Sequence, residues 1–120
     1  MTSKITGVIF DCADPAALAG FWAQVLGQRC DGEPDFAWLE GPYGVVSVGF
    51  QRVPESKVVK NRVHVDVTPS DIGQAEEVER LERLGARRID VGQPADASWV
   101  VMADPEGNEF CVLRPPAEGG

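Results

Sequence analysis

The sequence is poor in basic residues, and this scarcity limits the partners that we expect. Only 11 of the 120 residues are lysine or arginine, against 19 aspartates and glutamates, so the formal net charge is −8 at pH 7. Binding to nucleic-acid phosphates needs clustered cations, and we therefore expect no nucleic-acid partner. The acidic excess suits a neutral or cationic small molecule, or serves solubility alone.

Long apolar runs are also missing. The longest apolar stretches span a handful of residues, whereas a helix that crosses a bilayer needs about 20 apolar residues. We therefore expect no membrane partner. Met1-Thr2-Ser3-Lys4 leads into an alternating segment without the apolar stretch of a secretory signal. We expect a cytoplasmic protein whose residues 1–120 form a single domain.

The three cysteines form no CxxC pair, which argues against a zinc ribbon and against a thioredoxin-type motif. In a reducing compartment we expect them to be buried thiols rather than one disulfide and a leftover. They are Cys12, Cys30 and Cys111.

One strand–helix–strands pattern occurs twice along the chain. Asp14-Pro15 begins the first helix and Gly27 ends it, with apolar residues every three or four positions between them. Pro69-Ser70-Asp71 and Gly85 are the corresponding signals for the second helix. Residues 53–61 are polar and predict a linker. The predicted strands are residues 5–11, 28–31, 36–40 and 45–51 in the first half, and 62–67, 87–91, 98–103 and 108–114 in the second.

Two halves with the same βαβββ order, about residues 4–52 and 62–114, predict an α+β fold. We expect the two repeats to form a curled mixed sheet around a cleft, with the helices on the outside.

Three features together resemble the vicinal oxygen chelate superfamily, which includes glyoxalase I, bleomycin-resistance proteins, fosfomycin-resistance enzymes and extradiol dioxygenases. They are the paired layout, the helix end Val25-Leu26-Gly27, and Asp104-Pro105-Glu106-Gly107-Asn108-Glu109 before an apolar strand. More narrowly, residues 60–67 and 108–113 resemble small glyoxalase-like proteins of bacteria. The resemblance covers about residues 4–114 and is more specific for fold than for activity.

The resemblance implies a metal site with a reduced ligand set. Members of the superfamily often hold a divalent metal with one side chain from each of four strands. Carried over to the second half of this sequence, two of the four positions fall on His64, the only histidine, and on Cys111, where the superfamily usually has glutamate. The first-half counterpart falls near Gly7, which has no side chain to offer, and the fourth lies on the strand that carries Gln51. One zinc, nickel, manganese or iron ion is implied, and a metal-free protein is the alternative.

Other residues are candidates for catalysis and substrate binding. Glu109 shares a strand face with Cys111 and is the candidate general base; a glutamate that stays in water is the alternative. Arg62 is a candidate clamp for a substrate carboxylate or phosphate. Trp38 and Trp99 occupy matching places in the two halves, where they could stack a flat or cationic ligand or pack in the core. Gln51 completes the substrate-binding candidates.

The sequence thus predicts a glyoxalase-like small-molecule protein. One hypothesis is a metal-assisted lyase or isomerase acting on a small carbonyl substrate. The alternative is a metal-free protein that binds or sequesters a small molecule, like the bleomycin-resistance branch. Enzyme status stays open between them. Relatives usually pair, so we expect a homodimer, and the linker at residues 53–61 is long enough for two chains to exchange halves.

Overall fold

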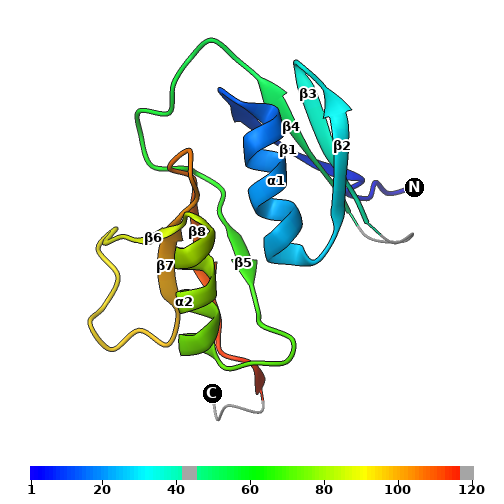
Figure 1. Ribbon diagram of the computed structural model, residues 1–120. Coiled ribbons are helices and arrows are strands. Elements are labelled where there is room, and N and C mark those ends of the chain that lie inside the picture. The colour runs from blue at the N-terminus through cyan, green and yellow to red at the C-terminus, as the bar shows by residue number, and fades with distance from the viewer. Residues whose placement is uncertain (42–45, 117–120) are drawn as a thin grey trace. The chain divides into compact units, whose positions relative to one another are not determined.

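The computed structural model describes residues 1–41 and 46–116. The chain divides into two compact units, Met1–Lys57 and Val58–Gly120, and each is described by itself. Both units run strand, helix, three strands, and each contains one four-stranded mixed sheet and one helix (Figure 1). The predicted α+β fold with two βαβββ modules is confirmed.

The first unit has the strand order β1-β4-β3-β2. Its first and last strands run parallel, and the other neighbours run antiparallel. Val45, the first residue of the strand predicted at residues 45–51, lies outside the described residues. The elements are β1 (Gly7–Cys12), α1 (Pro15–Leu26), β2 (Arg29–Glu33), β3 (Phe36–Glu40) and β4 (Ser47–Arg52).

Helix α1 begins and ends where local signals predict. The Asp14 side chain accepts the Ala17 N–H at 3.2 Å, and Pro15 occupies the first turn, where its missing N–H costs nothing. Gly27 ends the helix with φ of 64°, a left-handed conformation that favours glycine. The buried apolar residues of the helix are Leu18, Ala19, Phe21, Trp22, Ala23 and Val25.

The second unit repeats this topology with the order β5-β8-β7-β6, and β5 again runs parallel to the last strand. Its strands are shorter than predicted. The strand expected at residues 87–91 covers only the first two of them, because the Asp90 side chain accepts the Gly92 N–H at 2.7 Å and turns the chain. The elements are β5 (Val65–Val67), α2 (Gln74–Leu84), β6 (Arg87–Arg88), β7 (Val100–Ala103) and β8 (Glu109–Val112).

Helix α2 starts later than predicted. Pro69-Ser70-Asp71 precedes the helix but does not begin it; the cap is Gly73, whose N–H donates to the Glu76 side chain at 3.5 Å. Two glutamates in the first turn also favour this start, because they face the positive end of the helix dipole. The predicted end at Gly85 is confirmed.

The second sheet has two unlike faces, because neighbouring residues on a strand point to opposite sides. Phe110 and Val112 on β8, with Met102 on β7, are at most 1% exposed and share the core with Val78 and Leu81 of α2. The intervening residues of the same strands form the opposite face, which carries the candidate site. No helix in the described part of the chain is both long and apolar enough to cross a membrane.

Candidate functional site

A hollow of about 420 Å³ lies on the second sheet, on the face that carries Val101 and Cys111. All of its lining residues belong to the second unit. Its lining includes His64, Asp66 and Cys111, here called the floor residues, while Glu109 lies further along the strand that carries Cys111. The hollow therefore combines potential metal ligands with a carboxylate on one sheet face.

The strand register brings the three floor residues together. Asp66 on β5 stands opposite Cys111 on β8, and His64 lies two residues before Asp66, so it points to the same side of the extended chain. The His64 Nδ1 atom lies 3.7 Å from Asp66 Oδ1 and 4.0 Å from Cys111 Sγ. One ligand atom from each residue falls within 4.8 Å of the others.

This donor set fits a divalent metal of the zinc class. One nitrogen, one oxygen and one sulfur atom suit a borderline-soft ion better than magnesium, which prefers oxygen. Tetrahedral zinc, with bonds of about 2.0–2.3 Å, holds its donors about 3.3–3.6 Å apart. The His64 nitrogen lies 3.7 and 4.0 Å from the other two donors, and all three lie within 4.8 Å of one another, so the donors would have to move closer together to hold one ion. Three protein ligands leave a position for substrate or water.

The surroundings of the Cys111 thiol favour its protonated form. Burial raises its pKa first of all, and the charge and hydrogen bond of the Asp66 carboxylate raise it further, while the charge of Lys60 acts in the opposite direction. A metal ligand must be a thiolate, so binding at this site would displace the thiol proton.

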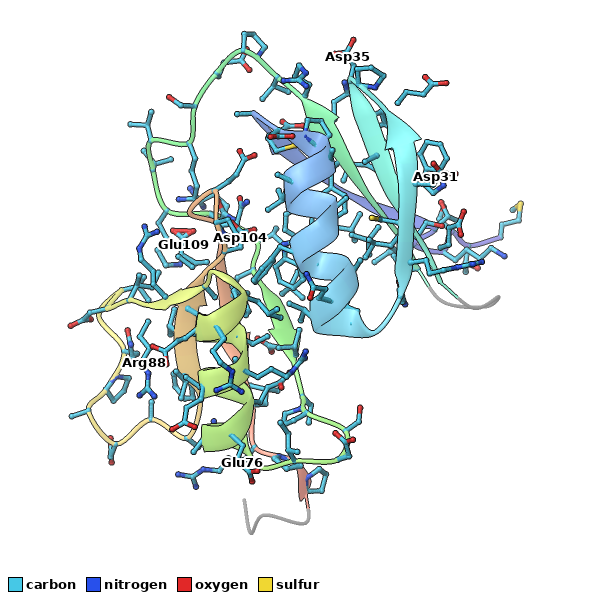
Figure 2. All side chains as sticks on the ribbon, viewed as in Figure 1. Asp31, Asp35, Glu76, Arg88, Asp104 and Glu109 are labelled. Atoms are coloured by element: carbon cyan, nitrogen blue, oxygen red, sulfur yellow. The ribbon has the colours of Figure 1, made fainter. Side chains whose placement is uncertain are left out.

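Glu109 is 7% exposed, and its carboxylate is held in place. The Asn61 N–H donates to both carboxylate oxygens, at 3.3 and 3.2 Å. The Asn61 side chain donates to Asn108, whose own amide donates to the fully buried Asp104. Figure 2 shows Glu109 and Asp104 close together in the second unit, near the start of β8. Glu109 is therefore a fixed, buried carboxylate that lines the same hollow as the three potential ligands.

The first unit offers no donors at the matching positions. Its parallel pair, β1 and β4, places Ile9 opposite Gly49, as β5 and β8 place Asp66 opposite Cys111. A Cβ atom on Gly49 would lie 2.7 Å from the ring of Phe36 and 2.9 Å from the end of Ile9. Apolar side chains therefore close over the position that a ligand would need.

Four of the five predicted site residues of the second half lie at the hollow, namely His64, Trp99, Cys111 and the candidate base Glu109. Arg62 is exposed and is not among the described lining residues, where the cation is Lys60. The substrate role of Arg62 stays a prediction.

The two predicted residues of the first unit have other contacts. The Gln51 amide donates to the backbone oxygens of Asp35 and Arg52, at 3.1 and 3.2 Å. Trp38 stacks on Phe36 with ring centroids 6.2 Å apart. Their substrate-binding role also stays a prediction.

Asp66 is the potential ligand that the sequence analysis did not select. A signal for it was present, because the His64–Asp66 spacing of two places both side chains on one face of an extended segment. Lys60 and the lining residues Val91, Gly92 and Gln93 were missed as well.

Comparison with known families and proteins gives one family match. A family model described as "Glyoxalase-like domain" matches residues 7–113. No curated protein matches the chain.

Solved structures with the same fold include a fosfomycin resistance protein, a glyoxalase/bleomycin resistance protein/dioxygenase family enzyme and a bleomycin-binding protein. The fosfomycin resistance protein FosX from Mesorhizobium loti is 15% identical, with a TM-score of 0.70 and 98% of both chains covered. A glyoxalase/bleomycin resistance protein/dioxygenase family enzyme from Burkholderia phytofirmans PsJN is 22% identical, with a TM-score of 0.64 and coverage of 92% of this chain and 97% of that one. The bleomycin-binding protein from Streptomyces verticillus, complexed with copper(II)-bleomycin, is 19% identical, with a TM-score of 0.56 and coverage of 95% and 99%. Because all three sequence identities are 22% or lower, these similarities show a shared fold alone.

Proposed function

Because the chain belongs to the glyoxalase-like domain family, we propose that its second sheet binds a small carbonyl compound and promotes a lyase or isomerase reaction with the help of a divalent metal. The observation that carries the proposal is the clustering of His64, Asp66 and Cys111. Their ligand atoms lie within 4.8 Å of one another at a hollow of about 420 Å³. A volume of this size suits a small organic ligand.

The residues of the site divide the chemistry between them. His64, Asp66 and Cys111 would hold the metal, and a bound divalent cation supplies a Lewis acid that polarises a carbonyl group. Glu109 would take a proton from the carbon next to that carbonyl and return it elsewhere on the substrate. The Asn61 N–H, which donates to both of its oxygens, keeps this carboxylate in one orientation.

A metal-free binding protein is the second candidate, and two observations favour it. Burial and Asp66 raise the pKa of Cys111, which opposes the thiolate that a metal needs. Gly49 and Ile9 also supply no donors in the first unit. Two fold neighbours are described as a fosfomycin resistance protein and a bleomycin-binding protein, which supports small-molecule binding as the broader class. The homodimer and the cytoplasmic location stay predictions.

Metal content distinguishes the two candidates. Untagged protein is stripped, reloaded separately with zinc, nickel, manganese and iron, and measured by elemental mass spectrometry. We expect one bound ion per chain, lost in His64→Ala, Asp66→Ala and Cys111→Ala. The matched controls replace groups of the same kind in the first unit, away from the hollow, namely the exposed Cys30 and Asp11 with alanine. Protein that binds none of the four metals would refute the metal-assisted reaction and leave the binding candidate.

A further inference from the structure

The two units differ most in one connection. In the first unit only Pro34 and Asp35 join β2 to β3, whereas residues 89–99 join β6 to β7 in the second. This long connection is the yellow-to-orange loop that projects from the second unit in Figure 1. Two modules of the same topology do not need such unequal connections, so the longer loop calls for a separate explanation.

The loop forms a wall of the hollow. Val91, Gly92 and Gln93 near its start and Trp99 at its end are lining residues. Val91 and Trp99 are each 37% exposed, so neither side chain is buried in the core. Trp99 comes directly before β7, and it lines the hollow together with Val101 of that strand.

Polar groups at the start of the loop are engaged within the loop itself. The Gln93 side chain accepts the Val91 N–H at 2.8 Å and donates to the Ile89 carbonyl at 3.1 Å. The Asp90 carboxylate accepts the N–H of Gly92, whose φ of 93° favours glycine. The wall therefore presents chiefly apolar surface to a ligand.

Both ends of the loop are anchored to the rest of the unit. The Ile89 N–H donates to the Val101 carbonyl at 3.1 Å. The Gln74 side chain of α2 donates to the Ser98 carbonyl at 2.8 Å and to the Val112 carbonyl at 2.9 Å. An anchored wall loses little conformational entropy when a ligand binds, which favours affinity.

We propose that Val91 and Trp99 form an apolar subsite for a flat, aromatic group, and that the ligand of this hollow is an aryl-bearing carbonyl compound. The inference rests on the proposed function, which places the carbonyl end at His64, Asp66 and Cys111. The aromatic end then lies against the indole of Trp99, where offset or edge-to-face packing is favourable. A small aliphatic aldehyde would leave this wall without contact.

Two hydroxamates test the subsite, because they share a metal-chelating head and differ in the tail. Benzohydroxamate carries a phenyl ring and acetohydroxamate carries a methyl group. Binding of each is measured by calorimetry on metal-loaded protein and by ligand-observed NMR on metal-stripped protein. We expect benzohydroxamate to bind at least about tenfold more tightly to loaded protein, as burial of much of a phenyl group predicts.

Substitutions assign the preference to the wall. Val91→Asp and Trp99→Ala should reduce it to about twofold or less, while Trp99→Phe, which keeps a flat ring, should retain most of it. Val58→Asp is the matched control, because Val58 is 87% exposed and lies outside the lining residues. An unchanged affinity for acetohydroxamate in each variant shows that the fold and the floor are intact.

The outcomes separate the subsite from the metal chemistry. Equal binding of the two probes to wild-type protein overturns the subsite, and so does a preference that survives both Val91→Asp and Trp99→Ala. If no metal loads, the proposed reaction fails. A phenyl preference in stripped protein that depends on Trp99 then still supports the subsite, whereas its absence there overturns it.

Discussion

Asp66 and Cys111 stand opposite each other in the parallel pair of β5 and β8, and the carboxylate of the first faces the thiol of the second. Burial and this carboxylate both raise the pKa of Cys111. The folded protein therefore keeps the thiol proton to a higher pH than the unfolded chain does. Stability in alkaline solution reports on this relationship directly.

The raised pKa of Cys111 predicts a loss of stability as the pH rises. The protonated Cys111 thiol makes its full contribution to the free energy of unfolding below the pKa of a thiol in the unfolded chain, about 8.5. This contribution is lost as the pH rises through the higher pKa of Cys111 in the folded protein. Urea unfolding of metal-stripped protein, compared between about pH 7.5 and 9.5, should show a smaller decline for Cys111→Ala than for wild type. Cys30→Ala, which removes an exposed thiol, should follow wild type. Equal declines in all three proteins would refute the assignment.

Removal of the Glu109 carboxylate should destabilise the fold. Glu109→Ala deprives the half-buried Asn61 N–H of its acceptor, which should lower the free energy of unfolding by about 1–3 kcal/mol. Glu109→Gln keeps an oxygen in reach and should cost less. The exposed Glu79 is the matched control, since its replacement by alanine should change stability by at most about 0.5 kcal/mol. Denaturant unfolding measures all three, and a neutral Glu109→Ala would show that the contact contributes nothing.

Asp104 should be the more sensitive carboxylate. It is 0% exposed, and its oxygens accept the backbone N–H groups of Glu106 and Asn108 and the side-chain amide of Asn108. Asp104→Ala removes several bonds to a charged acceptor at once and should cost about 3 kcal/mol or more. Asp104→Asn, which keeps one acceptor oxygen, should lie between alanine and wild type. Thermal unfolding that ranked asparagine below alanine would contradict this account.

Two glycines should respond to alanine in opposite directions. A Cβ atom on Gly20 in α1 would meet nothing within 4 Å, and alanine in a helix interior should stabilise by about 0.5–1 kcal/mol. A Cβ atom on Gly32 in β2 would lie 2.5 Å from the Ala37 Cα atom and 2.7 Å from the Phe36 carbonyl oxygen. Gly32→Ala must displace backbone and should cost at least about 1 kcal/mol. Parallel denaturant titrations measure both variants. A Gly32→Ala variant as stable as wild type would contradict the close β2–β3 approach, and a destabilised Gly20→Ala would contradict the open space at Gly20.

Local signals explain what could be predicted from the sequence. Asp14, Pro15 and Gly27 act within a few residues of the helix that they bound, so α1 was predicted correctly. Pro69-Ser70-Asp71 has the same local character, but the Glu76 contact with Gly73 determines the start of α2 instead. The strand predicted at residues 87–91 was too long because the Asp90 side chain accepts the Gly92 N–H and turns the chain, a contact that sequence periodicity does not report.

The candidate site, like the fold, could be predicted only where local spacing determines it. Spacing alone places His64 and Asp66 on one side of the chain. That Asp66 faces Cys111 depends on the register between β5 and β8, which are separated by a helix and two strands. Pairing between distant segments is not encoded in any short motif, so Asp66 was missed as a ligand although its neighbours were identified.

Within residues 1–41 and 46–116, the one cluster of potential donors lies in the second module, and this affects how the chain can diverge. In the first module, Ile9 and Gly49 occupy the matching positions without contributing a ligand atom. Mutations there remove no donor, so the candidate site of the second repeat can be retained while the first repeat changes. Because the first repeat contributes no ligand atom at these positions, substitutions in it can change which ligands the protein binds without affecting the candidate metal ligands.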